Sequence, residues 1–146
     1  LRCCGFKNAY TEQNLEFDED RIYHCEFNMS AGYEMASFVL KRYPEADSIL
    51  AGNDVMALGV LQYLEENKIK IGKKIGVIGF DDITLAKLSH IGLTTVKQQK
   101  YNIGRIMTNL LFSEISNNSN GITNFPQRIL LEPELIVRTT TVKGNR

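Results

Sequence analysis

The alternation of hydrophobic and polar residues along the chain predicts several strands. Residues 21–27 alternate apolar and polar side chains, which is typical of a half-buried strand. Apolar runs at 48–52 and 75–80 are bounded by turn-forming residues and predict buried strands, the second of them central in a parallel sheet. Residues 93–98 predict another extended segment, and 127–139 predict two short strands interrupted by a proline.

Between these strands, apolar residues recur at helical spacing. One helix is capped by Asn28 or Ser30 and ended by Pro44, and another opens at 53–54. Residues 101–115 show the clearest helical pattern. The side chains expected to face the core are Met35, Phe38 and Val39 in the first of these helices and Met56, Val60, Leu61 and Leu64 in the second. Successive strand–helix units with right-handed crossovers predict an α/β fold with a doubly wound parallel sheet.

Composition narrows the functional classes. The 146 residues are enough for one core, and the formal net charge of zero provides no field to gather phosphates, which argues against a nucleic-acid surface. No apolar run reaches the roughly 20 residues of a membrane helix, and no signal peptide is present. The chain starts at Leu1 rather than Met, and residues 1–14 predict the end of a helix, so we expect a fragment of a larger protein.

The cysteines and histidines give no sign of a metal site or a disulfide framework. Cys3, Cys4 and Cys25 are odd in number and lack paired spacing, and His24 and His90 are the sole imidazoles. We therefore expect packing roles for the cysteines, no metal, and free thiols in a reducing cytoplasm.

Aromatic, amide and carboxylate side chains follow the predicted strands at their carboxyl ends, where open parallel sheets bind ligands. These residues are Phe27 and Asn28 after the first strand, Asn53 and Asp54 after the second, Asp81 and Asp82 after the third, and Gln98 after the segment at 93–98. Carboxylates and amides bond hydroxyl groups, and an aromatic ring packs on a sugar face or stacks on a base. The set predicts a polyhydroxylated ligand, to which Arg2 adds donors if its helix points to the same edge.

Structural interpretations of the same residues stay open. Either residue of the pair 53–54 can simply cap its helix, and either residue of the pair 81–82 can bracket a turn. Phe27 can belong to the core, and Arg2 can be solvated.

Catalytic motifs are absent from the sequence. There is no glycine-rich dinucleotide or P-loop motif and no Gly-x-Ser-x-Gly elbow. The pair 81–82 is similar to the acidic pair of phosphorelay receiver domains, but those need a later aspartate and none follows Asp82. We expect neither an enzyme nor a cofactor.

The segment 47–82, DSILAGNDVMALGVLQYLEENKIKIGKKIGVIGFDD, and the following LTTVKQQKYNIG strongly resemble the LacI–GalR family of bacterial repressors. RCCGFKNAY near the start and LLEPELIVRTTT near the end also resemble that family, so the resemblance covers nearly the whole chain. Periplasmic sugar-binding proteins share two motifs of this segment, those at 53–59 and 79–82, more loosely.

The resemblance implies a type I periplasmic-binding-protein-like core, mostly its C-terminal subdomain, that binds an effector in a cleft between two subdomains. Matched by position, the implied ligand contacts are Arg2, Phe27, Asn53, Asp81 and Gln98. Asp54 is implied as a supporting contact, and as a direct ligand contact in the periplasmic sugar-binding relatives. Lys100 departs from the family at a position where some members place an aromatic ring in the cleft. Leu58 and Gln62 resemble part of the family's homodimer surface.

The resemblance also implies a division of the chain. Residues 1–98 are expected to belong to the incomplete C-terminal subdomain, 99–124 to a crossover whose helix joins the N-terminal subdomain, and 125–146 to returning strands and a tail. The family's N-terminal helix-turn-helix head, which contacts operator DNA, is not among these residues.

The first hypothesis is therefore the sugar-sensing and dimerisation region of a cytoplasmic LacI-type transcriptional repressor, away from any membrane. The alternatives are a periplasmic sugar-binding protein of a transporter, a sensor driven by a protein partner and, least favoured, an enzyme. LTTVKQ and the ending Arg138-Thr139-Thr140 favour the repressor.

Overall fold

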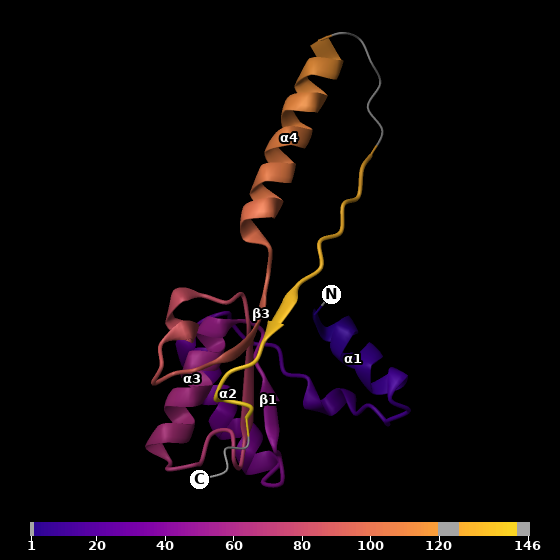
Figure 1. The fold of residues 1–146 in the computed structure, drawn as a ribbon. Helices are drawn as coiled ribbons and strands as arrows, with labels where there is room; N and C mark the ends of the chain where they lie inside the picture. Colours follow the sequence, from indigo (N-terminus) through magenta and orange to yellow (C-terminus); the bar gives the residue numbers. More distant parts are fainter. Residues whose placement is uncertain (1, 120–125, 143–146) are drawn as a thin grey trace.

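A four-stranded sheet forms the centre of the protein in this computed structural model, which describes residues 2–119 and 126–142. The strands, in their order across the sheet, are β1 (Ser48–Leu50), β2 (Gly76–Phe80), β3 (Thr94–Lys97) and β4 (Glu134–Ile136). β1, β2 and β3 are mutually parallel, whereas β4 runs antiparallel to β3 (Figure 1). The α/β class and the parallel sheet are as the sequence predicts.

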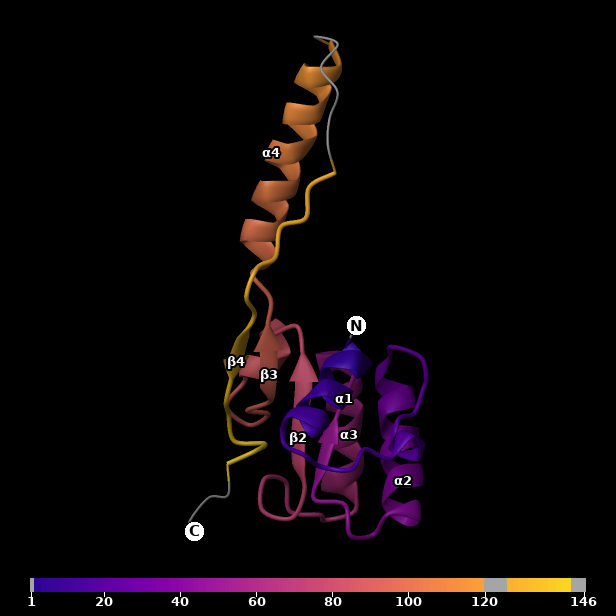
Figure 2. The ribbon, with the colours of Figure 1, turned by 90° about the vertical axis from the view of Figure 1, so that its right-hand side faces the viewer.

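Helices lie on both sides of this sheet, and one helix extends away from it. They are α1 (Arg2–Glu12), α2 (Met29–Arg42), α3 (Asp54–Glu66) and α4 (Lys100–Ser119), with short 3-10 turns at Glu19–Arg21 and Thr84–Lys87. α3 packs on the sheet and α2 packs outside α3, while α1 lies on the opposite side of the sheet (Figures 1 and 2). α4 extends away from the sheet, with the returning segment beside it (Figure 1). No helix within the described ranges is long and apolar enough to cross a membrane.

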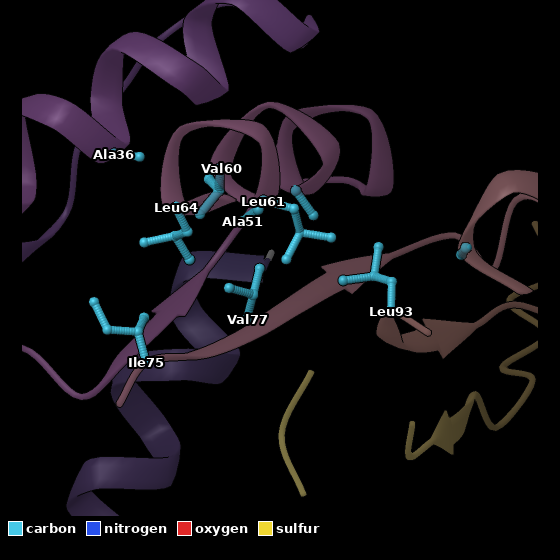
Figure 3. Packing of buried hydrophobic residues seen from close by; sticks show 10 residues of the cluster. Ala36, Ala51, Val60, Leu61, Leu64, Ile75, Val77 and Leu93 are labelled. Carbon is cyan, nitrogen blue, oxygen red and sulfur yellow. The ribbon is translucent and has the colours of Figure 1, made fainter. Parts of the chain in front are cut away.

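The core lies between α3 and the strands β2 and β3. Val60, Leu61 and Leu64 of α3 are buried, as predicted, and Leu61 and Leu64 extend toward Val77 of β2 (Figure 3). Each fully buried aliphatic side chain of this kind contributes about 1.5–3 kcal/mol by leaving water. This packing fixes the axis of α3 relative to the carboxyl ends of the strands.

Two glycines set the contact between α2 and α3. A Cβ atom on Gly32 would lie 2.1 Å from the carbonyl oxygen of Met56, and one on Gly59 would lie 1.9 Å from that of Met29. The helix backbones therefore touch, which no larger residue permits.

Because small residues make this contact, the stripe predicted for α2 is wrong. Gly32 and Ala36 are its buried residues, whereas Phe38 is 48% exposed and Met35 and Val39 are only partly buried. The hydrophobic pattern pointed to the large side chains, but close backbone approach selects the small ones.

Three further expectations need correction. Residues 22–27 form no strand, because none of the described strands pairs with them to provide ladder bonds. β1 lies at the sheet edge with Leu50 half exposed, so it is not a buried strand. The stretch 127–139 forms one strand, β4, rather than two, since 127–133 lies outside the sheet on the segment that returns beside α4 (Figure 1). The helix caps at Asn28 and Asn53 and the helix at 101–115 are confirmed.

Replacing Gly59 with alanine tests the helix contact. Because the new methyl group would overlap backbone atoms of α2, we expect Gly59→Ala to lower the free energy of unfolding by about 1–3 kcal/mol. Gly104 of α4 is the control: a Cβ there meets nothing within 4 Å, so Gly104→Ala should raise that free energy by up to about 1 kcal/mol. Urea unfolding followed by circular dichroism measures both, and a neutral Gly59→Ala would contradict the packing.

Candidate functional site

The carboxyl ends of the parallel strands lie at one edge of the sheet, and the first turn of α1 reaches the same edge (Figure 2). Arg2, on that turn, places its guanidinium 4.0 Å from the ring centroid of Phe80, the last residue of β2. Arg2 also donates a hydrogen bond to the carbonyl oxygen of Gly52, directly after β1. The helix containing Arg2 thus points to the predicted edge, where 43% of the arginine side chain stays exposed.

Asp81 is the centre of the polar cluster at this edge. Its carboxylate accepts a hydrogen bond of 2.6 Å from the side-chain amide of Gln98 and lies 3.9 Å from the guanidinium of Arg2. The ammonium of Lys100 donates to the backbone carbonyl of Asp81 at 2.5 Å. The structure therefore brings Arg2, Asp81 and Gln98 together, as the sequence predicts, and adds Lys100 to them.

Asn53 combines the capping role with a free donor. Its Oδ1 atom accepts a hydrogen bond of 2.8 Å from the backbone N–H of Met56 and so caps α3. Its Nδ2 atom makes no hydrogen bond within residues 2–119 and 126–142, and the side chain is partly exposed. Capping uses the oxygen and leaves the two amide protons for a ligand.

Phe27 is not a core residue, because 66% of it is exposed. One edge of its ring lies 3.1 Å from the position that a Cβ atom on Gly52 would take, close to the sulfur of Met56. Glycine at position 52 therefore lets an exposed aromatic ring lie beside the residue that Arg2 contacts.

Asp54 is completely buried, and protein donors occupy both of its oxygens. Oδ1 accepts a hydrogen bond of 2.5 Å from the hydroxyl of Thr95, and Oδ2 accepts one of 2.8 Å from the backbone N–H of Ile83. A Cβ atom on Gly79 would lie 2.2 Å from Oδ1, so this strand position requires glycine. The geometry favours the supporting role for Asp54 over direct contact with a ligand.

The adjacent residues Asp81 and Asp82 have different roles: Asp81 belongs to the polar cluster, and Asp82 stabilises the turn beneath it. Both residues have positive φ angles, 119° and 49°, which bend the chain sharply after β2. The carboxylate of Asp82 accepts a hydrogen bond of 2.7 Å from Arg138 and lies 3.2 Å from the ammonium of Lys87. Burial opposes ionisation of Asp82, but these cations outweigh it and hold its pKa below the usual value. Asp82 therefore anchors the turn that presents Asp81.

No sequence pattern indicated that Phe80, Thr95 and Arg138 are partners of the site. The sequence of 93–98 predicts an extended segment but not which residue Thr95 contacts, and Arg138 lies far along the chain from the site. The contact that each of these residues makes with the site forms only in the folded protein, where β2, β3 and the tail are adjacent.

Leu58 and Gln62 are not in this cluster but on the side of α3 that borders the 3-10 turn Thr84–Lys87 and Thr139, here called its outer side. They border a shallow hollow of about 520 Å³, together with Met29, Leu85, His90 and Thr139. Leu58 is partly buried and Gln62 is exposed, and Met29 and Leu85 leave apolar surface beside them.

Cysteines and acidic residues form no metal site in the part of the chain that the structure describes. Cys3 and Cys4 are exposed on α1, so the expectation that they pack inside is wrong. Cys25 is partly buried, and this burial raises the pKa of its thiol.

Residues 1–141 match the sequence profile of the periplasmic binding protein-like domain. The chain belongs to this family. Among its relatives, the regulator MalR of Clostridium butyricum, an HTH-type transcriptional regulator, is 31% identical over 94% of the chain and 39% of its own length. The chain thus spans about two fifths of that relative.

Solved structures of related transcriptional regulators have the same fold as this chain. The complex of the transcriptional regulator CelR with cellobiose superposes with a TM-score of 0.86 at 29% identity, covering 95% of the chain and 41% of CelR. A LacI-family regulator from Sanguibacter keddieii superposes with a TM-score of 0.86 at 30% identity, covering 96% of the chain and 51% of that structure. The resemblance of this periplasmic binding protein-like chain to LacI-type regulators is confirmed.

Proposed function

We propose that the chain is the effector-sensing and dimerisation region of a LacI-type transcriptional repressor, and that its effector is a sugar or a related polyhydroxylated molecule. The observation that carries this proposal is the cluster at the carboxyl edge, where Arg2, Asp81 and Gln98 converge beside the free amide of Asn53. The cellobiose bound by the related regulator CelR supports a sugar.

Each member of the cluster has a distinct role toward such a ligand. The carboxylate of Asp81 accepts from sugar hydroxyls, while Arg2 and Asn53 donate to them. The distance of 3.9 Å between Arg2 and Asp81 is longer than a direct hydrogen bond, so a hydroxyl can bond to both without separating a tight ion pair. Phe27, exposed beside Gly52, packs on the apolar face of a ring.

Residues 1–98 then form one wall of the effector site, and 99–124 join a second subdomain before 125–146 return. Exposed apolar side chains on α4 support this division, since isolated apolar surface of this extent needs a covering layer. These side chains are Tyr101, Met107, Leu111, Phe112 and Ile115. Effector binding between two subdomains changes their closure, which shifts the spacing of DNA-binding heads in a dimer.

Homodimerisation uses the outer side of α3, around Leu58 and Gln62. The apolar residues Met29, Leu85 and Leu88, each partly exposed nearby, support an interface there. Operator DNA is contacted by a helix-turn-helix head outside these residues, in the cytoplasm. The relatives named as transcriptional regulators favour this role over a transport component or an enzyme.

Replacing Asp81 tests the effector site. In calorimetric titrations of the regulator with sugars, sugar acids, sugar phosphates and nucleobases, we expect one compound to bind and Asp81→Asn to weaken its binding at least about tenfold, since a charged hydrogen-bond partner contributes about 1.5–3 kcal/mol. Glu134→Gln removes an exposed carboxylate that pairs with Lys97 and should leave the affinity unchanged. Intact operator binding that no sugar or nucleobase alters would contradict small-molecule sensing.

Replacing Leu58 tests the dimer surface. A buried charge in an apolar interface is costly, so Leu58→Arg should convert a dimer into a monomer in sedimentation velocity at micromolar concentration. Leu130, exposed near α4 and away from this surface, is the matched control as Leu130→Arg. A dimer that persists in Leu58→Arg would place the interface elsewhere.

A further inference from the structure

Lys100 gives the candidate effector site a second cation. α4 begins at this residue, and the ammonium reaches back 2.5 Å to the backbone carbonyl of Asp81. The guanidinium of Arg2 lies 3.9 Å from the carboxylate of the same aspartate. Two exposed cations therefore lie at Asp81, Arg2 near its partly exposed carboxylate and Lys100 at its backbone carbonyl.

The other carboxylates of this edge are already occupied. Asp54 is completely buried and bonded to Thr95 and Ile83, so it offers no oxygen to an incoming group. Asp82 is paired with Arg138 and Lys87, and its side chain is almost fully covered. The cations of this contact network are Arg2, Lys87, Lys100 and Arg138, and its carboxylates are Asp54, Asp81 and Asp82. Positive charge is in excess, and it lies where the surface is open.

The donors of Arg2 and Lys100 are also only partly used. Lys100 donates one of its three ammonium protons to the carbonyl of Asp81. Arg2 has five donors, of which one bonds the carbonyl of Gly52, and its guanidinium lies 3.9 Å from the carboxylate of Asp81. The N-terminus of the 20-residue helix α4 adds its partial positive charge at the same place. An anion here would gain charge-assisted hydrogen bonds without breaking a buried pair.

We propose that the effector is a sugar derivative with an anionic group, a phosphate monoester or a carboxylate, bound between Lys100 and Arg2. Its hydroxyls face Asp81 and Asn53. Lys100 is the residue that selects the anionic derivative over the neutral sugar. This inference rests on the proposed function and adds the chemical class of its effector.

Matched ligands test this selection. The regulator is titrated by calorimetry at low ionic strength with glucose, galactose and fructose, with their 6-phosphates, and with glucuronate and galacturonate. At least one anionic member should bind about tenfold or more tightly than its neutral partner, and added salt should reduce the difference. The 6-phosphates and the uronates separate the two sources of negative charge.

Two lysine variants complete the experiment. Lys100→Met should abolish the preference for the anionic member, whereas Lys97→Met, which removes an exposed lysine paired with Glu134, should retain it. Both lysines are exposed, and urea unfolding verifies that each variant remains folded.

Equal or tighter binding of the neutral sugars overturns the inference about charge but leaves the proposed function standing. A preference for anions that survives Lys100→Met also overturns it. Absence of binding by every member of both classes contradicts the effector site itself.

Discussion

The buried carboxylate of Asp54 is the interaction on which the candidate site depends. It joins the first turn of α3 to Thr95 of β3 and to the backbone of Ile83, just beyond β2. Burying a carboxylate is costly unless its oxygens are bonded, and here both are. This arrangement fixes the positions of Asn53, the bend at Asp81 and the end of β3 relative to one another. It also requires glycine at position 79, because no Cβ atom fits beside the carboxylate. The polar cluster is thus built on a rigid support.

α3 connects the regions with proposed roles. Its N-terminus carries Asn53 and Asp54 at the effector edge, and its outer side carries Leu58 and Gln62 at the proposed dimer surface. Since the packed residues Val60, Leu61 and Leu64 fix this helix on the sheet, a displacement at one region reaches the other through a rigid element. α4 extends from the same edge, with Lys100 at its base. The proposed effector would therefore contact both the sheet and the helix that leads away from it.

Local sequence patterns predicted the structural features that depend only on residues close together along the chain, such as helix caps and strands. Asn53 is recognisable as a cap, and the apolar run at 75–80 is recognisable as a central strand. Contacts between distant segments were beyond such signals. Nothing in RIYHCEF shows that 22–27 lack a ladder partner, and helical spacing favours Phe38 over Gly32 because it ignores backbone approach. The adjacent aspartates 81 and 82 are alike in sequence, and only the tertiary positions of Arg2 and Arg138 give them different roles.

The central claim is that Asp54 supports the site from within the protein. The most direct measurement is amide hydrogen exchange at Ile83, with urea unfolding, in Asp54→Asn, and with the exposed Asp47→Asn as control. Asparagine has one acceptor oxygen in place of two and carries no charge, so the hydroxyl of Thr95 and the N–H of Ile83 can no longer both donate to residue 54. We therefore predict a loss of about 1–3 kcal/mol and faster exchange at Ile83. Stability and Ile83 exchange equal to those of the unsubstituted protein would contradict it.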